Sequence, residues 1–129
     1  MEEDFRALLL AAAGVTNIVG TRVEWGSLGQ GVSLPAVLLT LIDGAEGMTH
    51  EGPDGLTSAR VQVDCYADNI GTAIVLRRAV IAALNGHKDA NFQGVFHEGT
   101  RSTREGGTNE ASRPYRESLD FEAHWRADT

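Results

Sequence analysis

One segment, residues 58–68, alternates between apolar and polar side chains without a break. A period of two over this length predicts a β-strand with one dry face and one polar face. The Asp68-Asn69 pair that follows is favourable for capping a helix, so the strand is expected to lead directly into a helix over 70–84. The apolar face of the expected strand carries Ala59, Val61, Val63, Cys65 and Ala67, and the polar face carries Arg60, Gln62, Asp64 and Tyr66.

The other patterns predict a two-layer α+β fold. Phe5, Leu8, Leu9 and Ala12 recur at helical spacing after three acidic residues, which favours an amphipathic helix at the start of the chain. Further expected elements are a helical turn at 16–20 and strands at 22–25, 36–42, 92–97 and 115–125. Hairpin-type connections between strands favour a mainly antiparallel sheet of four to five strands, with two helices packed on one face.

The length of 129 residues predicts a single domain over 1–129. Within it, 43–55 and 99–114 have no apolar periodicity and are expected to be long loops, the first of them at the tip of a long hairpin. Small domains rarely keep loops of this length without a use, so both are expected to make contacts outside the domain.

Charge is distributed unevenly along the chain. The net charge is −7, and residues 1–56 hold eight acidic residues against two arginines, a balance of −6. Tight binding of nucleic acid depends on neutralising phosphates with basic side chains, so this composition argues against it.

No arrangement of residues indicates an active site, a metal or a cofactor. The four histidines are scattered, and the single cysteine, Cys65, lies on the apolar face of the expected strand. The acids of 43–54 do not have the spacing of a calcium-binding loop. The longest apolar run, 7–13, is too short to cross a membrane, and the acidic start is unlike a signal peptide. We therefore expect a non-enzymatic protein that is made in the cytoplasm and has no membrane partner.

Several segments together are similar to a known family. They are Leu8–Ala11, Val15–Val23, Leu34–Val37, Arg60–Asp68, the apolar positions of 70–84 and the final strand ending at Trp125. In these segments the chain resembles the tail terminator, or tail completion, proteins of long-tailed phages and of phage-derived gene transfer agents.

This resemblance implies a structural role in the tail or neck of a virion or virion-like particle. Such proteins form a hexameric ring at the head-proximal end of the tail tube, end tube polymerisation and join tail to head. The implied partners are further copies of the chain, the tail tube protein, a head-side connector or stopper protein, and DNA that passes through without specific binding. The resemblance brings no catalytic residues.

Two groups of residues are the predicted contact sites. The subunit or tube interface is assigned to Arg60, Gln62, Asp64, Tyr66, Arg101, Arg104, Arg113 and Arg116. An acidic loop facing the channel or a neighbour is assigned to Asp43, Glu46, Glu51 and Asp54. The acidic segment 1–56 and the arginine-bearing segment 99–116 are one possible complementary pair for a ring. The alternative is a small dimeric, ferredoxin-like α+β domain that binds a ligand or catalyses a reaction; it requires an enclosed pocket with convergent polar groups.

Overall fold

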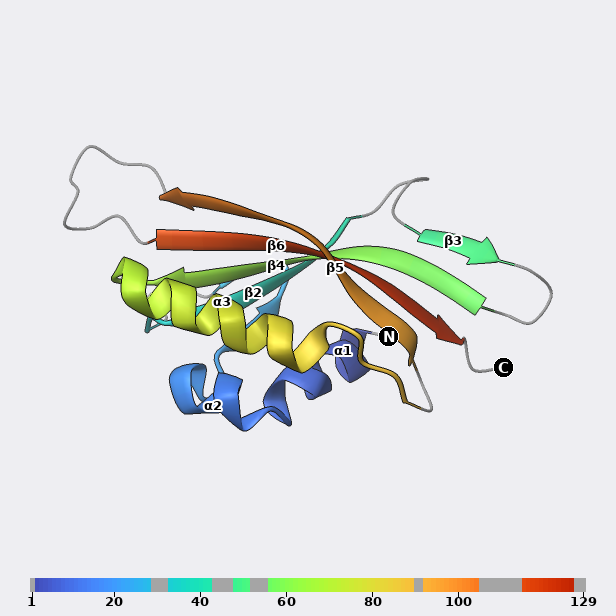
Figure 1. Ribbon diagram of the computed structural model, residues 1–129, viewed down its shortest axis with the longest axis horizontal. Coiled ribbons are helices and arrows are strands. Elements are labelled where there is room, and N and C mark those ends of the chain that lie inside the picture. The colour runs from blue at the N-terminus through green and yellow to red at the C-terminus, as the bar shows by residue number, and fades with distance from the viewer. Residues whose placement is uncertain are drawn as a thin grey trace.

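The computed structural model describes residues 2–28, 33–42, 48–51, 56–89, 92–104 and 115–126, and the account below concerns these residues. Three helices and six strands follow one another in the order α1, α2, β1, β2, β3, β4, α3, β5, β6 (Figure 1). Their bounds are α1 Glu2–Leu10, α2 Ala13–Val19, β1 Val23–Trp25, β2 Ala36–Ile42, β3 Met48–Glu51, β4 Leu56–Ala67, α3 Ile70–Leu84, β5 Phe92–Arg104 and β6 Tyr115–Arg126.

Strand β4, which contains the alternating segment, lies at the centre of the sheet. The strand order is β1-β2-β4-β6-β5, and β3 pairs with β4 on the same side as β2. Only β1 is parallel to its neighbour; the other pairs are antiparallel. The predicted α+β class with a mainly antiparallel sheet is therefore confirmed, with more strands and one more helix than expected.

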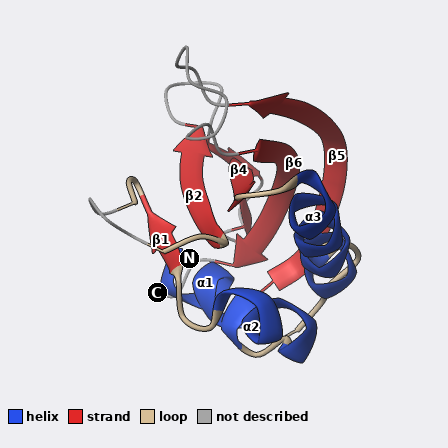
Figure 2. Ribbon diagram, turned by 90° about the vertical axis from the view of Figure 1, so that its left-hand side faces the viewer, coloured by secondary structure: helices blue, strands red, loops and turns tan. Residues whose placement is uncertain are grey.

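All three helices lie on one face of the sheet, which curls around them (Figures 1 and 2). The odd-numbered residues of β4 face the helices, as their alternation predicts, and Val61, Val63 and Cys65 are fully buried. The remainder of the core comes from both the helices and the sheet and includes Phe5, Leu9, Val15, Val19, Val23, Val37, Leu39, Leu76, Val80, Leu84, Phe92, Val95, Leu119 and Phe121.

Cys65 is a core residue. Burial raises the pKa of its thiol, and the neighbouring carboxylates of Asp64 and Glu117 raise that pKa further.

The connection from β4 to α3 is the one that the sequence predicts. The Asn69 side chain accepts a hydrogen bond of 2.8 Å from the backbone N–H of Thr72 and so caps the helix. At the other end, Gly86 adopts a φ of 79°, a left-handed conformation that glycine tolerates, and turns the chain into β5.

Both expected loops are shorter than predicted. Residues 48–51 form β3 inside the segment 43–55, and β5 continues to Arg104, well into the segment 99–114. A residue inserted at each of two bulges, between Phe92 and Gly94 and between His97 and Gly99, interrupts the alternation of β5, which explains why the sequence pattern ended at His97. Helix α2 spans Ala13–Val19, so it begins three residues before the helical turn expected at 16–20.

Candidate functional site

The sheet face opposite the helices carries the polar residues of β4, β5 and β6. We call this surface the polar face and define it by Arg60, Gln62, Asp64, Tyr66, Arg101, Arg116, Ser118, Asp120 and Glu122. The register between the strands brings its members together: Asp64 is opposite Ser118, and Gln62 is opposite Asp120. Six of the eight residues predicted for the interface lie on it; Arg104 and Arg113 are considered below.

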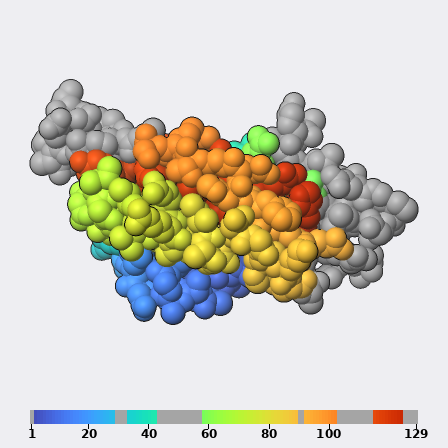
Figure 3. Space-filling model, viewed as in Figure 1, coloured from blue at the N-terminus to red at the C-terminus, as the bar shows by residue number. Residues whose placement is uncertain are grey.

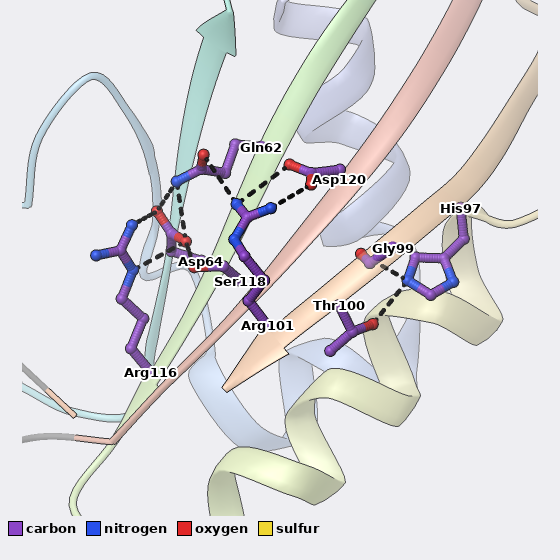
Figure 4. A network of polar contacts seen from close by, with 9 residues as sticks. All are labelled: Gln62, Asp64, His97, Gly99, Thr100, Arg101, Arg116, Ser118 and Asp120. Carbon is purple, nitrogen blue, oxygen red and sulfur yellow. Dashed lines mark hydrogen bonds and ion pairs between the residues drawn. The ribbon is translucent and has the colours of Figure 1, made fainter. Parts of the chain in front are cut away.

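Asp64 is at the centre of the polar face and is 1% exposed. Its carboxylate accepts two hydrogen bonds from the Arg116 guanidinium, from Nε at 3.1 Å and from Nη2 at 3.3 Å. The Gln62 amide donates to the same carboxylate at 3.0 and 3.2 Å, and the Ser118 hydroxyl donates to Oδ1 (Figure 4). A buried charge is tolerated only when it is paired and hydrogen-bonded, and these bonds meet that requirement.

A second ion pair ties β5 to the same network. Arg101 donates to Asp120 at 2.6 Å and contacts the Gln62 side-chain oxygen at 3.5 Å (Figure 4). Gln62 therefore links the Asp64–Arg116 pair to the Arg101–Asp120 pair across three strands. The two arginines are neutralised within the subunit, which the sequence pattern did not predict.

The other predicted residues are placed as follows. The Arg116 guanidinium lies 5.9 Å from the centre of the Tyr66 ring, and Arg60 is exposed and pairs in register with Glu122. The backbones of Arg104 and Glu51 end β5 and β3, but their side chains lie outside the described residues. Arg113, Asp43, Glu46 and Asp54 lie outside them entirely.

The sequence patterns did not predict a buried ion pair that lies on the helix face of the sheet. Arg77 of α3 donates to Glu117 of β6 at 2.6 Å, and the Glu117 side chain is only 3% exposed. The sequence marks each residue separately but not their pairing: Glu117 falls among the apolar positions of its strand, and Arg77 falls in a predominantly apolar helix. This pair joins α3 to β6 in addition to the apolar contacts of the core.

A surface hollow of about 260 Å³ lies beside the polar face, and Lys88, Gln93, Gly94, Phe96 and His124 line it. The Phe96 ring is 42% exposed and lies against the Gly94 backbone, where a Cβ would be 2.6 Å from the ring. Within the described residues, no group of three or more His, Cys, Asp or Glu side chains is placed to hold a metal ion. No helix among those described is long and apolar enough to cross a membrane.

These features define a small two-layer α+β domain with one sheet face cross-linked by ion pairs. The family model of tail completion protein gp17 matches residues 3–125. A solved structure described as "Virion of native gene transfer agent (GTA) particle" contains a chain with the same fold, with a TM-score of 0.69 and 19% identity over 95% of this chain and 92% of that one. No curated protein matches the chain.

The chain belongs to the tail completion protein gp17 family, as the sequence resemblance indicated. It is a structural protein of a phage-like tail and a virion component. The family match indicates this structural role and not the enzymatic alternative.

Proposed function

We propose that the protein forms a hexameric ring on the head-proximal end of a tail tube, where it stops tube growth and joins the tail to the head. The observation that carries this proposal is the family match over residues 3–125, nearly the whole described domain. The likeness of its fold to a chain in a gene transfer agent virion supports the same setting.

The size of the domain is compatible with passage of DNA. A compact chain of 129 residues is about 35 Å across. Six such subunits in a closed ring leave a hole of about the same width, which is ample for a duplex.

The charges of the polar face also suit a surface past which DNA moves. Arg101 and Arg116 each have a carboxylate partner in the same subunit. An arginine already paired in this way gains little by exchanging its carboxylate for a phosphate, and the whole chain carries −7. DNA would therefore pass without being held.

The neighbouring subunit, the tube protein and a head-side connector or stopper are the proposed partners. For the contact between subunits we retain the complementarity between the acidic segment 1–56 and the arginines of 99–116. Since Arg101 and Arg116 are neutralised within the subunit, this complementarity would depend on Arg104 and Arg113.

The direct test is electron microscopy of particles made without this protein. We expect tails of uncontrolled length and heads without tails, and expression of the protein in trans should restore both. Tails of normal length joined to filled heads in its absence would contradict the proposal.

A further inference from the structure

Strand β5 is an edge strand of 13 residues, and the residues that the structure describes close its outer edge along only half of its length. The turn after α3 covers the first half. Val95 donates to the His87 carbonyl at 3.2 Å and accepts from the Gly86 N–H at 2.6 Å. The His97 N–H donates to the Asn85 side chain, and Phe92 exchanges hydrogen bonds with Asp89.

The same bonds identify which groups of the second half point outward. Residues of an antiparallel strand turn their N–H and C=O groups alternately towards the partner and away from it. Phe92, Val95 and His97 turn theirs away from β6, opposite Trp125, Ala123 and Phe121. Continuing by twos along β6, through Leu119 and Glu117, places Thr100 and Ser102 in the same outward orientation.

The His97 ring contacts the Gly99 carbonyl at 3.0 Å and the Thr100 hydroxyl at 2.9 Å (Figure 4). Among the described residues, none bonds to the outward backbone groups of β5 beyond them. Residues 100–102 are exposed, and β5 lies at the surface above α3 in the space-filling view (Figure 3). Unpaired edges of this kind bind another strand readily.

The opposite side of the sheet is closed in one part and open in another. At β1, Arg6 of α1 donates to the Val23 carbonyl at 2.6 Å and so blocks that edge. Strand β3 pairs with β4 on one side, and no described residue pairs with its other side.

We propose that the outer edge of β5, at residues 99–104, pairs with the outer edge of β3, at residues 48–51, in the next copy of this chain. This inference rests on the proposed ring. A second copy is favoured over a foreign strand because a foreign strand would itself present a new edge and leave β3 open. Head-to-tail pairing around a closed ring removes every such edge.

Strand direction and charge agree with this pairing. Within the subunit, β3, β4, β6 and β5 are successively antiparallel, so β3 of the next copy continues the alternation beside β5. Besides Arg101, which Asp120 neutralises, residues 99–104 contain one arginine, Arg104, and no acid, whereas residues 48–51 contain one acid, Glu51, and no arginine or lysine.

Disulfide trapping in assembled particles tests the pairing. Ser102→Cys is combined in one chain with His50→Cys, and separately with Met48→Cys to sample the register, because the strand register places all three positions on the same face of the sheet. We expect one of the combinations to give a ladder of covalent oligomers up to six on oxidation, and each single variant to stay monomeric. Cys65 gives no background because it is buried.

The alternatives give different results. Covalent dimers from Ser102→Cys alone would mean that β5 pairs with β5 about a two-fold axis, and would overturn the inference. Double variants that reach the tails in normal amount without cross-linking would also overturn it, while leaving the proposed function intact. Absence of the unsubstituted protein from purified tails would overturn both the proposed function and this inference.

A proline variant provides a second measurement. Ser102→Pro removes one outward N–H without touching the ladder to β6, and Ser102→Ala keeps that N–H. We expect Ser102→Pro to lower the assembled fraction at least tenfold with an unchanged circular dichroism spectrum, and Ser102→Ala to assemble normally. Equal assembly of the two folded variants would overturn the inference; should Ser102→Pro fail to fold, the cross-linking result decides.

Discussion

Arg116 and Asp64 lie 52 positions apart in the chain, and Arg116 donates two hydrogen bonds to the Asp64 carboxylate, at 3.1 and 3.3 Å. The carboxylate is buried on a sheet face that carries no described helix, so side chains of the neighbouring positions cover it instead. The central strand of the sheet is thus held to β6 by charge as well as by the backbone ladder.

Loss of Arg116 should destabilise the domain measurably. Arg116→Ala leaves Asp64 buried with only Gln62 and Ser118 as described partners, and we expect a cost of about 2 kcal/mol in the free energy of unfolding. Arg101→Ala is the matched control: the Arg101 side chain is 56% exposed, so its pair with Asp120 should contribute at most about 1 kcal/mol. Urea unfolding measures the free energy of unfolding of both variants. Equal losses would contradict the conclusion that the buried Asp64 carboxylate depends on Arg116.

Arg77 on the helix face should matter more. Arg77→Ala leaves the Glu117 carboxylate buried without its arginine, which we expect to cost about 3 kcal/mol. Replacing both residues, with Arg77→Met and Glu117→Leu, should recover most of that loss because no uncompensated charge remains. The adjacent Arg78 is exposed, so Arg78→Ala should change stability by less than about 0.5 kcal/mol. A double variant no more stable than Arg77→Ala would argue against a buried pair.

Local periodicity accounts for what the sequence predicted well. Alternation assigned Val61, Val63 and Cys65 to the core and Gln62 and Asp64 to the other face, and both assignments hold. These predictions need only the period of the strand and the rule that one face is buried.

Features that depend on distant partners could not be read in this way. Strand β3 has four residues in a glycine-rich acidic segment and is defined by pairing with Leu56–Ala59. The pairs Arg116–Asp64 and Arg77–Glu117 depend on strand register and helix placement, which no local pattern specifies. The side chain of Arg104 and the whole of Arg113 fall outside the described residues, so their proposed role remains a prediction.

The buried thiol of Cys65 should make stability fall in alkaline solution. Burial favours the neutral thiol, so its pKa in the folded state is raised above the ordinary value of about 9. Above pH 9 the unfolded chain releases this proton and the folded chain retains it. The free energy of unfolding should then fall by up to about 1.4 kcal/mol per pH unit through this group.

The comparison with Cys65→Ala between pH 8 and 10.5 isolates this contribution, since lysine and tyrosine titrate in both proteins. The variant starts from lower stability because of the lost packing, but its slope with pH should be shallower. Parallel slopes would show that the thiol ionises in the folded protein as it does when exposed.

Charge reversal tests the proposed contact between subunits. Arg104→Glu combined with Arg113→Glu would oppose like charges at the acidic segment 1–56 of a neighbour. Each exposed pair is worth at most about 1 kcal/mol, but in a ring the loss is repeated at every interface. We therefore expect rings to form only at much higher protein concentration, and the defect to shrink in high salt because screening weakens exposed charges.

Lys88→Glu combined with Arg78→Glu applies the same change in net charge elsewhere and should leave assembly unchanged. Native mass spectrometry across a concentration and salt series measures this, and rings that form equally well from both double variants would rule out the charge pairing.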